Sequence, residues 1–450
     1  MNPVTVREYD YLICEDDGRA DDLHSYRWSK NIPESAYKYL ERLLFQDEEK
    51  EQSDDHSFFL KRTSRNRRPA LQLQSYVGVL QTPCGTQIEI LPKTADGTDS
   101  GNQQSRDMLF RMLRHLRGAS FKLGGDANLR HAHMHLLEIF ITYFLKEVNL
   151  LVKKGVRSEY VAREENQAFL KGKLLINQHI RVNAVQQQRF YVSYDEYLPD
   201  RPENRLIHAA LEKVSRLSRS ADNQRLSREL MFVFDDVPVS QDVRKDFSQC
   251  KFNRAMVHYR HPLEWCRLIL NEQSTVSAAG KTQTISILFP MEKIFEDYVA
   301  AMLRRNLSPK GYQIITQASG KHLCIEPKKL FQLRPDILIK KKGSDGEEDK
   351  CWVADTKWKL IDASVAKHGI SQGDMYQLYA YGKKYENEGC EGLFLIYPEV
   401  SGFKNEAAYK FEDNLGLKCL PFSCDKDKAE SFSIVLEESA SDYKSGEGCT

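Results

Sequence analysis

Hydrophobic and polar positions alternate in the first part of the chain, as they do in strands that bury one face. Two such runs, LQLQSYVGVLQTP and TQIEILPK, are joined through Pro83-Cys84-Gly85, a turn sequence that predicts a β-hairpin. A stretch rich in Gly, Ser, Asp and Asn at 96–105 predicts a loop. These patterns favour a β-rich N-terminal domain over residues 1–124.

A helical period replaces this alternation from about Ala127 to Leu270. Apolar residues lie three or four positions apart in HMHLLEIFITYFLKEVNLLVKKG, and Gly155 predicts the end of that helix. Further along, Asp200-Arg-Pro-Glu203 has the pattern of a capping box and predicts a second helix start. A small, polar stretch at 276–284 predicts a boundary, so residues 125–280 form a mainly helical middle region.

The remaining range, 281–450, mixes strands with helices and predicts an α/β domain with a small mixed sheet. The whole chain is thus expected to be a multidomain α/β protein. Two helices are expected at MEKIFEDYVAAMLRRNL and GDMYQLYAYGKKY, and strands at TISILFP and at about 312–317, 330–341, 351–358 and 392–397.

Composition narrows the class of protein. A chain of 450 residues exceeds one compact core, so two or three domains are expected. The net charge of +1 argues against a histone-like polycation, yet a local basic patch can still bind DNA. No apolar run reaches the roughly 18 residues of a membrane span, and no secretory signal is visible at the N-terminus.

Two absences from the sequence exclude further kinds of site. The ten cysteines form no CxxC pair, which argues against a zinc site and favours reduced thiols in a cytoplasmic protein. The chain has no GxxxxGK[ST] motif, so it lacks a P-loop and is not expected to hydrolyse nucleotides itself. Any motor must therefore be another polypeptide.

The candidate chemistry lies in RPDILIKKKGSDGEEDKCWVADTKWK, from Arg334 to Lys359. Asp336 precedes one apolar run and Asp355 lies within the next, so both carboxylates can bind one divalent cation. The backbone carbonyl of Thr356 is a possible third ligand. Lys357 shares a strand face with Asp355 and is expected to hold the attacking water or stabilise transition-state charge. Mg²⁺ fits such oxygen ligands best, and the pattern predicts a metal-dependent nuclease.

A bland alternative treats Pro-Asp as a turn and Asp-x-Lys as an edge-strand ion pair. The context favours the catalytic interpretation, because both motifs lie in consecutive predicted strands. The run VADTKWK also places two charges within an apolar strand, and buried charges need a metal or an ion-pair partner.

Two helical residues are candidate supports for this site. Glu296 lies at the edge of the apolar stripe of its helix, from which its side chain can reach a cleft. Gln377 and Tyr381 are four residues apart and share one helix face, where they can contact phosphate or brace Lys357. A solvated glutamate is the alternative for Glu296, and core packing is the favoured role for Tyr381.

Two other polar clusters are expected to carry no chemistry. His131, His133 and His135 lack the Glu of an HExxH motif and are interpreted as surface histidines. The basic run from Lys61 to Arg68 adjoins an acidic one and is interpreted as a solvated loop, with phosphate contact as the alternative.

The joint pattern of FEDYV, RPDILI, ADTKWK and MYQLYAYG resembles the PD-(D/E)xK nuclease superfamily. Within it, the chain resembles the McrC family, the nuclease subunit of McrBC-type modification-dependent restriction systems. Three upstream segments support the likeness, which runs from about residue 75 to 400: GTQIEILPK, YVAREENQAFLKGKL and YDEYLPDRPENRLIHAAL. The chain departs from the family in the segment 47–69 and in a Cys-containing tail after about residue 405.

This resemblance implies a Mg²⁺-dependent DNA endonuclease subunit of a phage-defence system. Its C-terminal domain would cut double-stranded, modified DNA through Asp336, Asp355 and Lys357, with Glu296 and Gln377 in support. Its N-terminal part would dock on a separate AAA+ GTPase ring, whose hydrolysis it stimulates and which alone uses GTP or another NTP. Two alternatives stay open: a catalytically silent subunit that bridges the ring to another effector, and a stand-alone nuclease.

Overall fold

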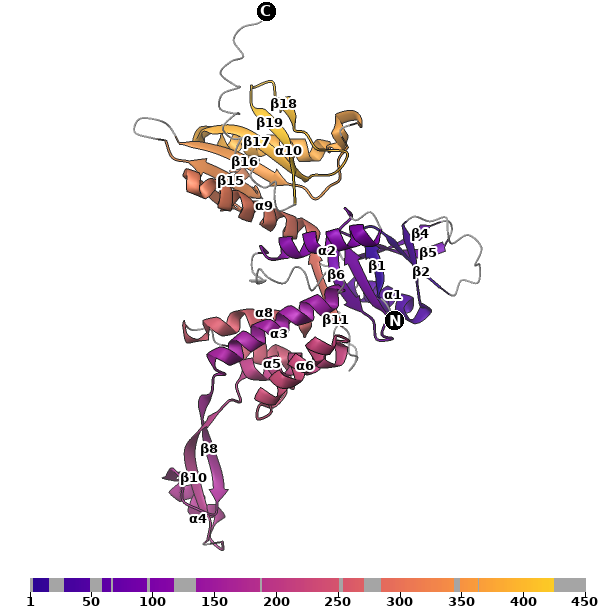
Figure 1. Cartoon of the computed structure of the whole chain (residues 1–450). Helices are drawn as coiled ribbons and strands as arrows, with labels where there is room; N and C mark the ends of the chain where they lie inside the picture. The colour runs from indigo at the N-terminus through magenta and orange to yellow at the C-terminus, as the bar shows by residue number, and fades with distance from the viewer. Residues whose placement is uncertain are drawn as a thin grey trace, which may run out of the picture.

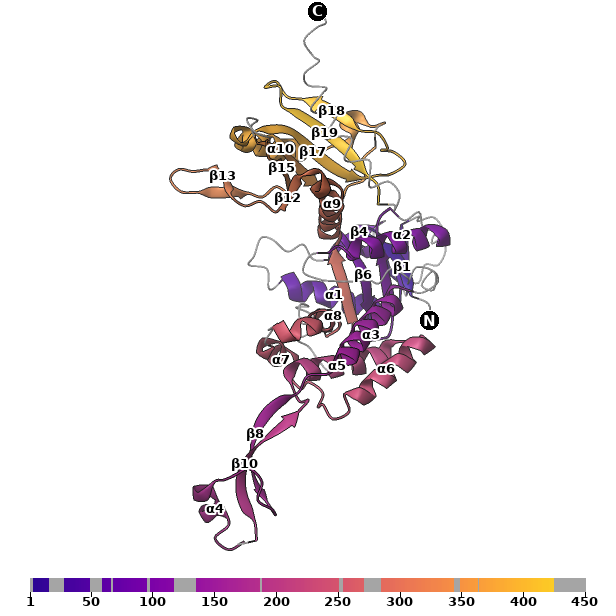
Figure 2. The same ribbon diagram turned by 60° about the vertical axis from the view of Figure 1, so that its left-hand side comes forward.

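The computed structural model gives the protein an elongated form. In Figures 1 and 2 the C-terminal sheet lies at one end, the N-terminal sheets in the middle, and a narrow two-stranded arm projects beyond a group of helices at the other end. The structure describes residues 3–15, 28–48, 59–65, 68–94, 98–116, 135–186, 188–250, 254–270, 285–343, 349–362 and 364–424.

Two four-stranded sheets form the N-terminal part, in the orders β1-β7-β6-β11 and β3-β2-β5-β4. The predicted hairpin is confirmed, since β6 and β7 pair antiparallel on either side of the turn. The basic run expected to be a solvated loop belongs instead to the β4–β5 hairpin, because its residues Lys61–Arg65 pair with Arg68–Gln72. The elements are β1 (Val4–Arg7), β2 (Tyr11–Cys14), β3 (Ser29–Ile32), α1 (Glu34–Glu48), β4 (Leu60–Arg65), β5 (Arg68–Leu73), β6 (Tyr76–Gln81) and β7 (Gln87–Leu91).

The fourth strand of the first sheet comes from far along the chain. Strand β11 (Ile285–Pro290) pairs antiparallel with β6, so this sheet draws on both the first and the third predicted ranges. Gly78 allows the close approach: it has φ +135°, and a Cβ there would lie 2.0 Å from the Ile287 carbonyl oxygen. The domain ranges themselves stay a prediction.

The prediction of a loop at 96–105 is wrong from Thr98 onward. Helix α2 (Asp99–Leu113) begins there, with the Thr98 side chain as its N-cap, accepting a hydrogen bond from the Gly101 amide. The first turns of this helix are polar and only its last turns bury apolar side chains, among them Leu109 and Leu113. Polar composition therefore hid the helix.

Helices dominate the middle region, as predicted. Helix α3 ends at the expected glycine, Gly155, which has φ +96°. The prediction of a capping box is wrong in detail. Arg201 is the N-cap of α5, because Pro202 occupies its first helical position. Asp200 forms an ion pair with Arg205 instead. The helices are α3 (Leu136–Lys154), α5 (Pro202–Leu217), α6 (Ala221–Val233), α7 (Val243–Gln249) and α8 (Arg260–Ile269).

The projecting arm corrects the helical prediction for part of this region. Strands β8 (Glu159–Gln167) and β10 (Phe190–Leu198) pair antiparallel along nine residues, with β9 (Lys173–Leu174) and α4 (Ile176–Val182) at the far end. Most side chains of the arm are not buried, so its strands lack the apolar alternation by which strands are recognised.

The C-terminal domain is a six-stranded mixed sheet, confirming the predicted fold class. Its order is β12-β15-β16-β17-β19-β18, with β16, β17 and β19 parallel. The strand predicted at 330–341 is broken in two, because Pro335 has no N–H to continue a ladder. The elements are α9 (Met291–Leu307), β12 (Tyr312–Thr316), β13 (Lys321–Cys324), β14 (Leu330–Leu333), β15 (Ile337–Lys341), β16 (Lys350–Thr356), α10 (Gln372–Tyr385), β17 (Cys390–Pro398), β18 (Ala407–Lys410) and β19 (Gly416–Phe422).

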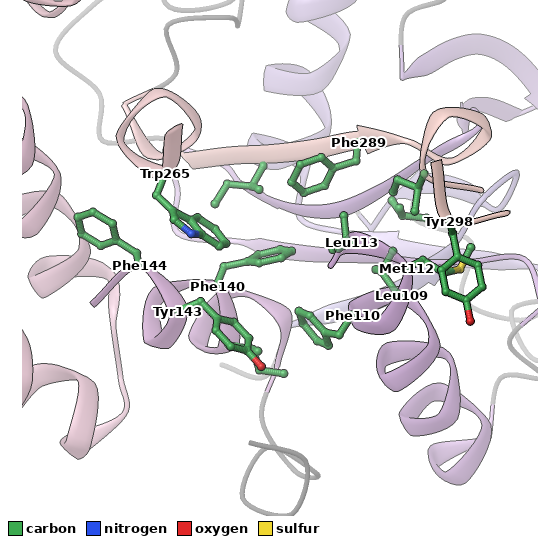
Figure 3. Packing of buried hydrophobic residues seen from close by; sticks show 14 of the residues in the cluster. Leu109, Phe110, Met112, Leu113, Phe140, Tyr143, Phe144, Trp265, Phe289 and Tyr298 are labelled. Atoms are coloured by element: carbon green, nitrogen blue, oxygen red, sulfur yellow. The ribbon is translucent and has the colours of Figure 1, made fainter. Parts of the chain in front are cut away.

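Each face of this sheet is covered by one helix. Alternate residues such as Ile337 and Ala354 join the core around α9, whereas Leu338 and Val353 join the core around α10. The α9 core is continuous with that of α2, α3, α8 and β11, and Figure 3 shows its aromatic side chains packed together. One hydrophobic core therefore connects the C-terminal domain with the first N-terminal sheet and the middle helices.

Candidate active site

The ends of β15 and β16 place the two predicted carboxylates side by side. Asp336 immediately precedes β15, and Asp355 is the second-last residue of β16. The antiparallel pairing of Ile337 with Ala354, continued by one residue, sets Asp336 opposite Asp355. Asp355 is only 2% exposed, whereas Asp336 is half-buried.

Thr356 and Gln317 fix the Asp336 carboxylate. The Thr356 amide and its Oγ1 each donate to Asp336 Oδ2 at 2.8 Å, and Gln317 Nε2 donates to Oδ1 at 3.2 Å. The Gln317 amide also donates to the Asp336 carbonyl at 2.9 Å. Thr356 thus orients a carboxylate through its amide and hydroxyl, and metal binding by its carbonyl stays a prediction.

Lys357 links the buried carboxylate to α10. Its Nζ lies 2.6 Å from Asp355 Oδ2 and donates to Gln377 Oε1 at 3.2 Å. Gln377 Nε2 in turn donates to the Tyr381 hydroxyl at 2.8 Å, which donates to the Arg334 carbonyl at 3.3 Å. The lysine is therefore held between a carboxylate and a hydrogen-bonded chain that returns to the segment carrying Asp336.

The charged groups of this site shift one another's pKa. Burial, together with the charge of Asp336, raises the pKa of Asp355 to about 7 despite the nearby Lys357. Burial alone would lower the pKa of Lys357, but the charges of Asp355 and Asp336 outweigh it and the net pKa is raised. Lys357 is therefore a protonated donor, and the carboxylate pair favours an added cation.

Glu296 lies in the same network. It is 7% exposed on α9, and Gln317 Nε2 donates to Glu296 Oε1 at 2.8 Å as well as to Asp336. Burial and the charge of Asp336 raise the pKa of Glu296. The five side chains predicted as catalytic are thus brought together.

Gln317 is the residue of this network that the sequence did not reveal. It has φ +52° and directly follows β12, a position at which a single glutamine carries no recognisable motif. Only the fold shows that it bridges Glu296 and Asp336. Tyr381, for which core packing was favoured, is indeed buried in the α10 core, while its hydroxyl takes part in the network.

The side chains present fit a Mg²⁺ site of the kind that uses few protein ligands. Within the ranges that the structure describes, no three His, Cys, Asp or Glu side chains gather as a metal-binding group. Mg²⁺ is commonly bound through one or two carboxylates, with water and substrate phosphate completing its shell. Asp355 and Asp336 supply such a pair, and their neighbouring like charges favour a bound cation.

The histidine cluster is only partly within the described residues. His131 and His133 lie outside them. His135 Nδ1 lies 3.8 Å from Glu89 Oε2, in a network with Arg106 that joins elements of the N-terminal core.

In the part of the chain that the structure describes, no helix is long and apolar enough to cross a membrane.

The comparison with protein families decides the kinship of the chain. The family model of the McrBC 5-methylcytosine restriction system component matches residues 71–398. The chain belongs to this family. The match includes the N-terminal hairpin, the projecting arm and the whole candidate site, which agrees with the resemblance carried by the motifs.

The fold of the chain is similar to that of chains in solved McrBC complexes. One similar chain is described as part of a "refined half-complex from tetradecameric assembly of Thermococcus gammatolerans McrB AAA+ hexamers with bound McrC". It is 20% identical, with a TM-score of 0.71, and the match covers 97% of this chain and 100% of that chain. A second similar chain comes from the cryo-EM structure of the Thermococcus gammatolerans McrBC complex, with 23% identity, a TM-score of 0.49, and coverage of 72% and 90%. A search of curated proteins gave no match. Since the chain has no P-loop, its fold is that of a McrC-type subunit.

Proposed function

We propose that the chain is the DNA endonuclease subunit of a McrBC-like restriction system. The observation that carries this proposal is the assembly of Asp336, Asp355 and Lys357 at one edge of a mixed sheet, with Glu296 and Gln377 bonded into the same network. A structural ion pair would not need a second carboxylate beside the buried one, because two like charges destabilise the fold.

The chemistry follows from the protonation of these groups. Bound Mg²⁺ would neutralise the scissile phosphate and lower the pKa of a bound water. Asp355 and Asp336 would hold it, with Thr356 and Gln317 fixing the orientation of Asp336. Because the pKa of Lys357 is raised, its Nζ stays protonated and donates to a phosphate oxygen or to the attacking water rather than acting as a base.

A separate NTPase is the proposed partner. The similar Thermococcus chain was solved with McrB AAA+ hexamers, and this chain has no P-loop of its own. The net charge of +1 provides little general attraction to DNA, so affinity for the target would come largely through the partner. We propose an AAA+ ring that recognises modified DNA, hydrolyses GTP or another NTP, and is stimulated by this chain.

The function is tested by reconstitution. The full chain is mixed with a McrB-type AAA+ protein, NTP, and circular DNA with and without 5-methylcytosine. Cleavage is expected with Mg²⁺ and is expected to disappear when EDTA removes the metal, while the isolated chain cuts little. Stimulated NTP hydrolysis with no cleavage under any divalent metal would instead support the silent bridging subunit. Efficient cleavage by the chain alone would support a stand-alone nuclease.

A hairpin beside the site offers a DNA-contacting surface. Strands β13 and β14 pair antiparallel and project from the C-terminal domain, as Figure 2 shows, and the chain passes from β14 directly to Asp336. Its exposed tip carries Lys328 and Lys329, and Phe331 is 70% exposed. Lysines on a hairpin that leads directly to the proposed cleavage site are placed to contact the phosphates of a bound duplex.

Replacing both Lys328 and Lys329 by alanine is therefore expected to weaken DNA binding by the assembled complex. Two lost phosphate contacts reduce the slope of log affinity against log salt by about 2, and KM rises while kcat changes little. The matched control replaces Lys153 and Lys154, an exposed pair at the end of α3 in the middle region. An unchanged salt slope in the hairpin variant would exclude this surface as a phosphate contact.

A further inference from the structure

The residue that follows the catalytic-site lysine is held by the other end of the chain. Trp358 is 3% exposed, and its indole Nε1 donates to Glu8 Oε2 at 2.9 Å. Lys93 Nζ donates to the Trp358 carbonyl at 2.6 Å. The side chain and the backbone of one residue are thus both bound by the N-terminal sheet. We call Glu8 and Lys93 the Trp358 clamp.

The clamp is fixed in place by its own sheet. Glu8 follows β1 and Lys93 follows β7, and these strands are parallel neighbours, so the two residues lie at the same edge. The Lys93 amide donates to Glu8 Oε2 at 3.0 Å, and Ser75 Oγ donates to Oε1 at 3.3 Å. The Glu8 carboxylate is therefore held by two donors of its own part of the chain as well as by Trp358.

On its other side, Trp358 contacts the supports of the candidate site. Its ring packs against Phe295, with centroids 5.2 Å apart, and Phe295 adjoins Glu296 on α9. The Lys357 amide donates to the Ile396 carbonyl of β17 at 2.9 Å. The amide of Lys357 is thus bonded to the C-terminal sheet, and the next residue, Trp358, is bonded to the clamp.

Burial makes this arrangement unusual for a purely structural contact. Burial raises the pKa of Glu8 and lowers the pKa of Lys93, so each charge is disfavoured where it stands. Charged groups at a buried contact are often less stable than apolar side chains of similar volume. The pair does, however, recognise both a donor and an acceptor of Trp358, which apolar side chains cannot do.

We propose that Glu8 and Lys93 are positioning residues for cleavage, which act through Trp358 to set Lys357 against Asp355. The proposal rests on the function proposed above and extends it: the N-terminal domain controls whether the nuclease site is assembled. A partner that shifts the N-terminal sheet would displace Lys357, because the clamp transmits the movement across one peptide unit. A misplacement of about 1 Å can cost a reaction about 100-fold in rate.

The test uses the full chain in the reconstituted complex and four variants. Trp358→Phe keeps the ring packing but removes the indole donor, and Glu8→Ala removes the acceptor. Glu8→Gln keeps an acceptor oxygen of the same reach. The control is Trp352→Phe, the same substitution on β16, since the Trp352 Nε1 has no hydrogen-bond partner among the described residues.

Trp358→Phe and Glu8→Ala are each expected to lower kcat by about 10-fold or more with an unchanged KM for DNA. Glu8→Gln is expected to recover most of the loss, and Trp352→Phe to retain kcat within about twofold, since it removes no hydrogen bond. If folded Trp358→Phe and Glu8→Ala cleave as fast as the control, the clamp has no positioning role.

A second measurement does not depend on cleavage. Hydrogen exchange of the backbone amides of residues 355–359, followed by mass spectrometry, is expected to quicken in Glu8→Ala and Trp358→Phe but not in Trp352→Phe. Unchanged exchange in the first two variants would overturn the proposal even if the wild-type protein proved unable to cut DNA. Absence of cleavage by the wild type, with altered exchange in the variants, would overturn the proposed function alone.

Discussion

Replacing Lys357 by alanine is expected to lower kcat for DNA cleavage by about 100- to 1,000-fold, the usual loss when a charge-stabilising donor is removed. Its Nζ is the one ammonium group in contact with Asp355 and Gln377 among the described residues, and its raised pKa keeps it protonated. Cleavage of modified plasmid by the reconstituted complex is the measurement. Stimulation of the partner's NTP hydrolysis is expected to survive, because it does not use the site.

The matched control is Lys359→Ala. Lys359 lies two residues further on and has its own partner, Asp374, at 2.7 Å. Cleavage within about threefold of the wild type is expected there, since Lys359 is bonded to Asp374 and not to Asp355 or Gln377. Equal losses in both variants would mean that positive charge in general, and not the Lys357 donor, supports the reaction.

Asp355→Asn adds a test of the carboxylate pair. The variant is expected to lose DNA cleavage. In the absence of metal, its unfolding temperature is expected to be no lower than that of the wild type. The reason is that burial and Asp336 disfavour the Asp355 charge, so removing that charge relieves strain in the metal-free protein. A markedly lower unfolding temperature would mean that Asp355 is chiefly a structural ion-pair partner of Lys357.

Local sequence signals were sufficient for elements with a strong period. The helix ending at Gly155 and the hairpin around Pro83 were predicted because apolar spacing and turn residues act over a few positions. The projecting arm was missed for the opposite reason: its strands bury little, so pairing between β8 and β10 determines their structure and apolar alternation is absent.

The candidate site divides in the same way. Asp336, Asp355 and Lys357 were predicted because they interrupt apolar strands with charge, a pattern readable in one dimension. Gln317 and the Trp358 clamp were not, since their roles arise from contacts between distant segments. Glu8 and Trp358 are 350 residues apart, and no local spacing connects them. Sequence reasoning therefore identified the charged side chains that the fold brings together, and it missed the contacts that orient them.

A fully buried carboxylate, Glu89 of β7, joins several elements of the N-terminal core. Arg106 of α2 donates to it through Nε at 2.9 Å and through Nη2 at 2.6 Å. The Leu136 amide at the start of α3 donates at 2.9 Å, and Thr5 Oγ1 of β1 donates at 3.0 Å. One side chain thus connects two strands and two helices, and removing it leaves the largely buried Arg106 without its partner.

Glu89→Ala is accordingly expected to destabilise the protein by about 3–5 kcal/mol, measured by urea unfolding followed by circular dichroism. Exposed Glu412, replaced in the same way, should change the stability by less than about 0.5 kcal/mol.

Burial alone would raise the pKa of Glu89, but hydrogen bonds from His135 and Arg106 lower it to about 2. Because this folded-state pKa lies below the ordinary 4.5, the contribution of Glu89 is complete above about pH 4.5 and is lost as the pH falls toward 2. Wild-type stability should therefore decline over that interval more steeply than that of Glu89→Ala, and parallel curves would show that the carboxylate is not the ionised centre of this network.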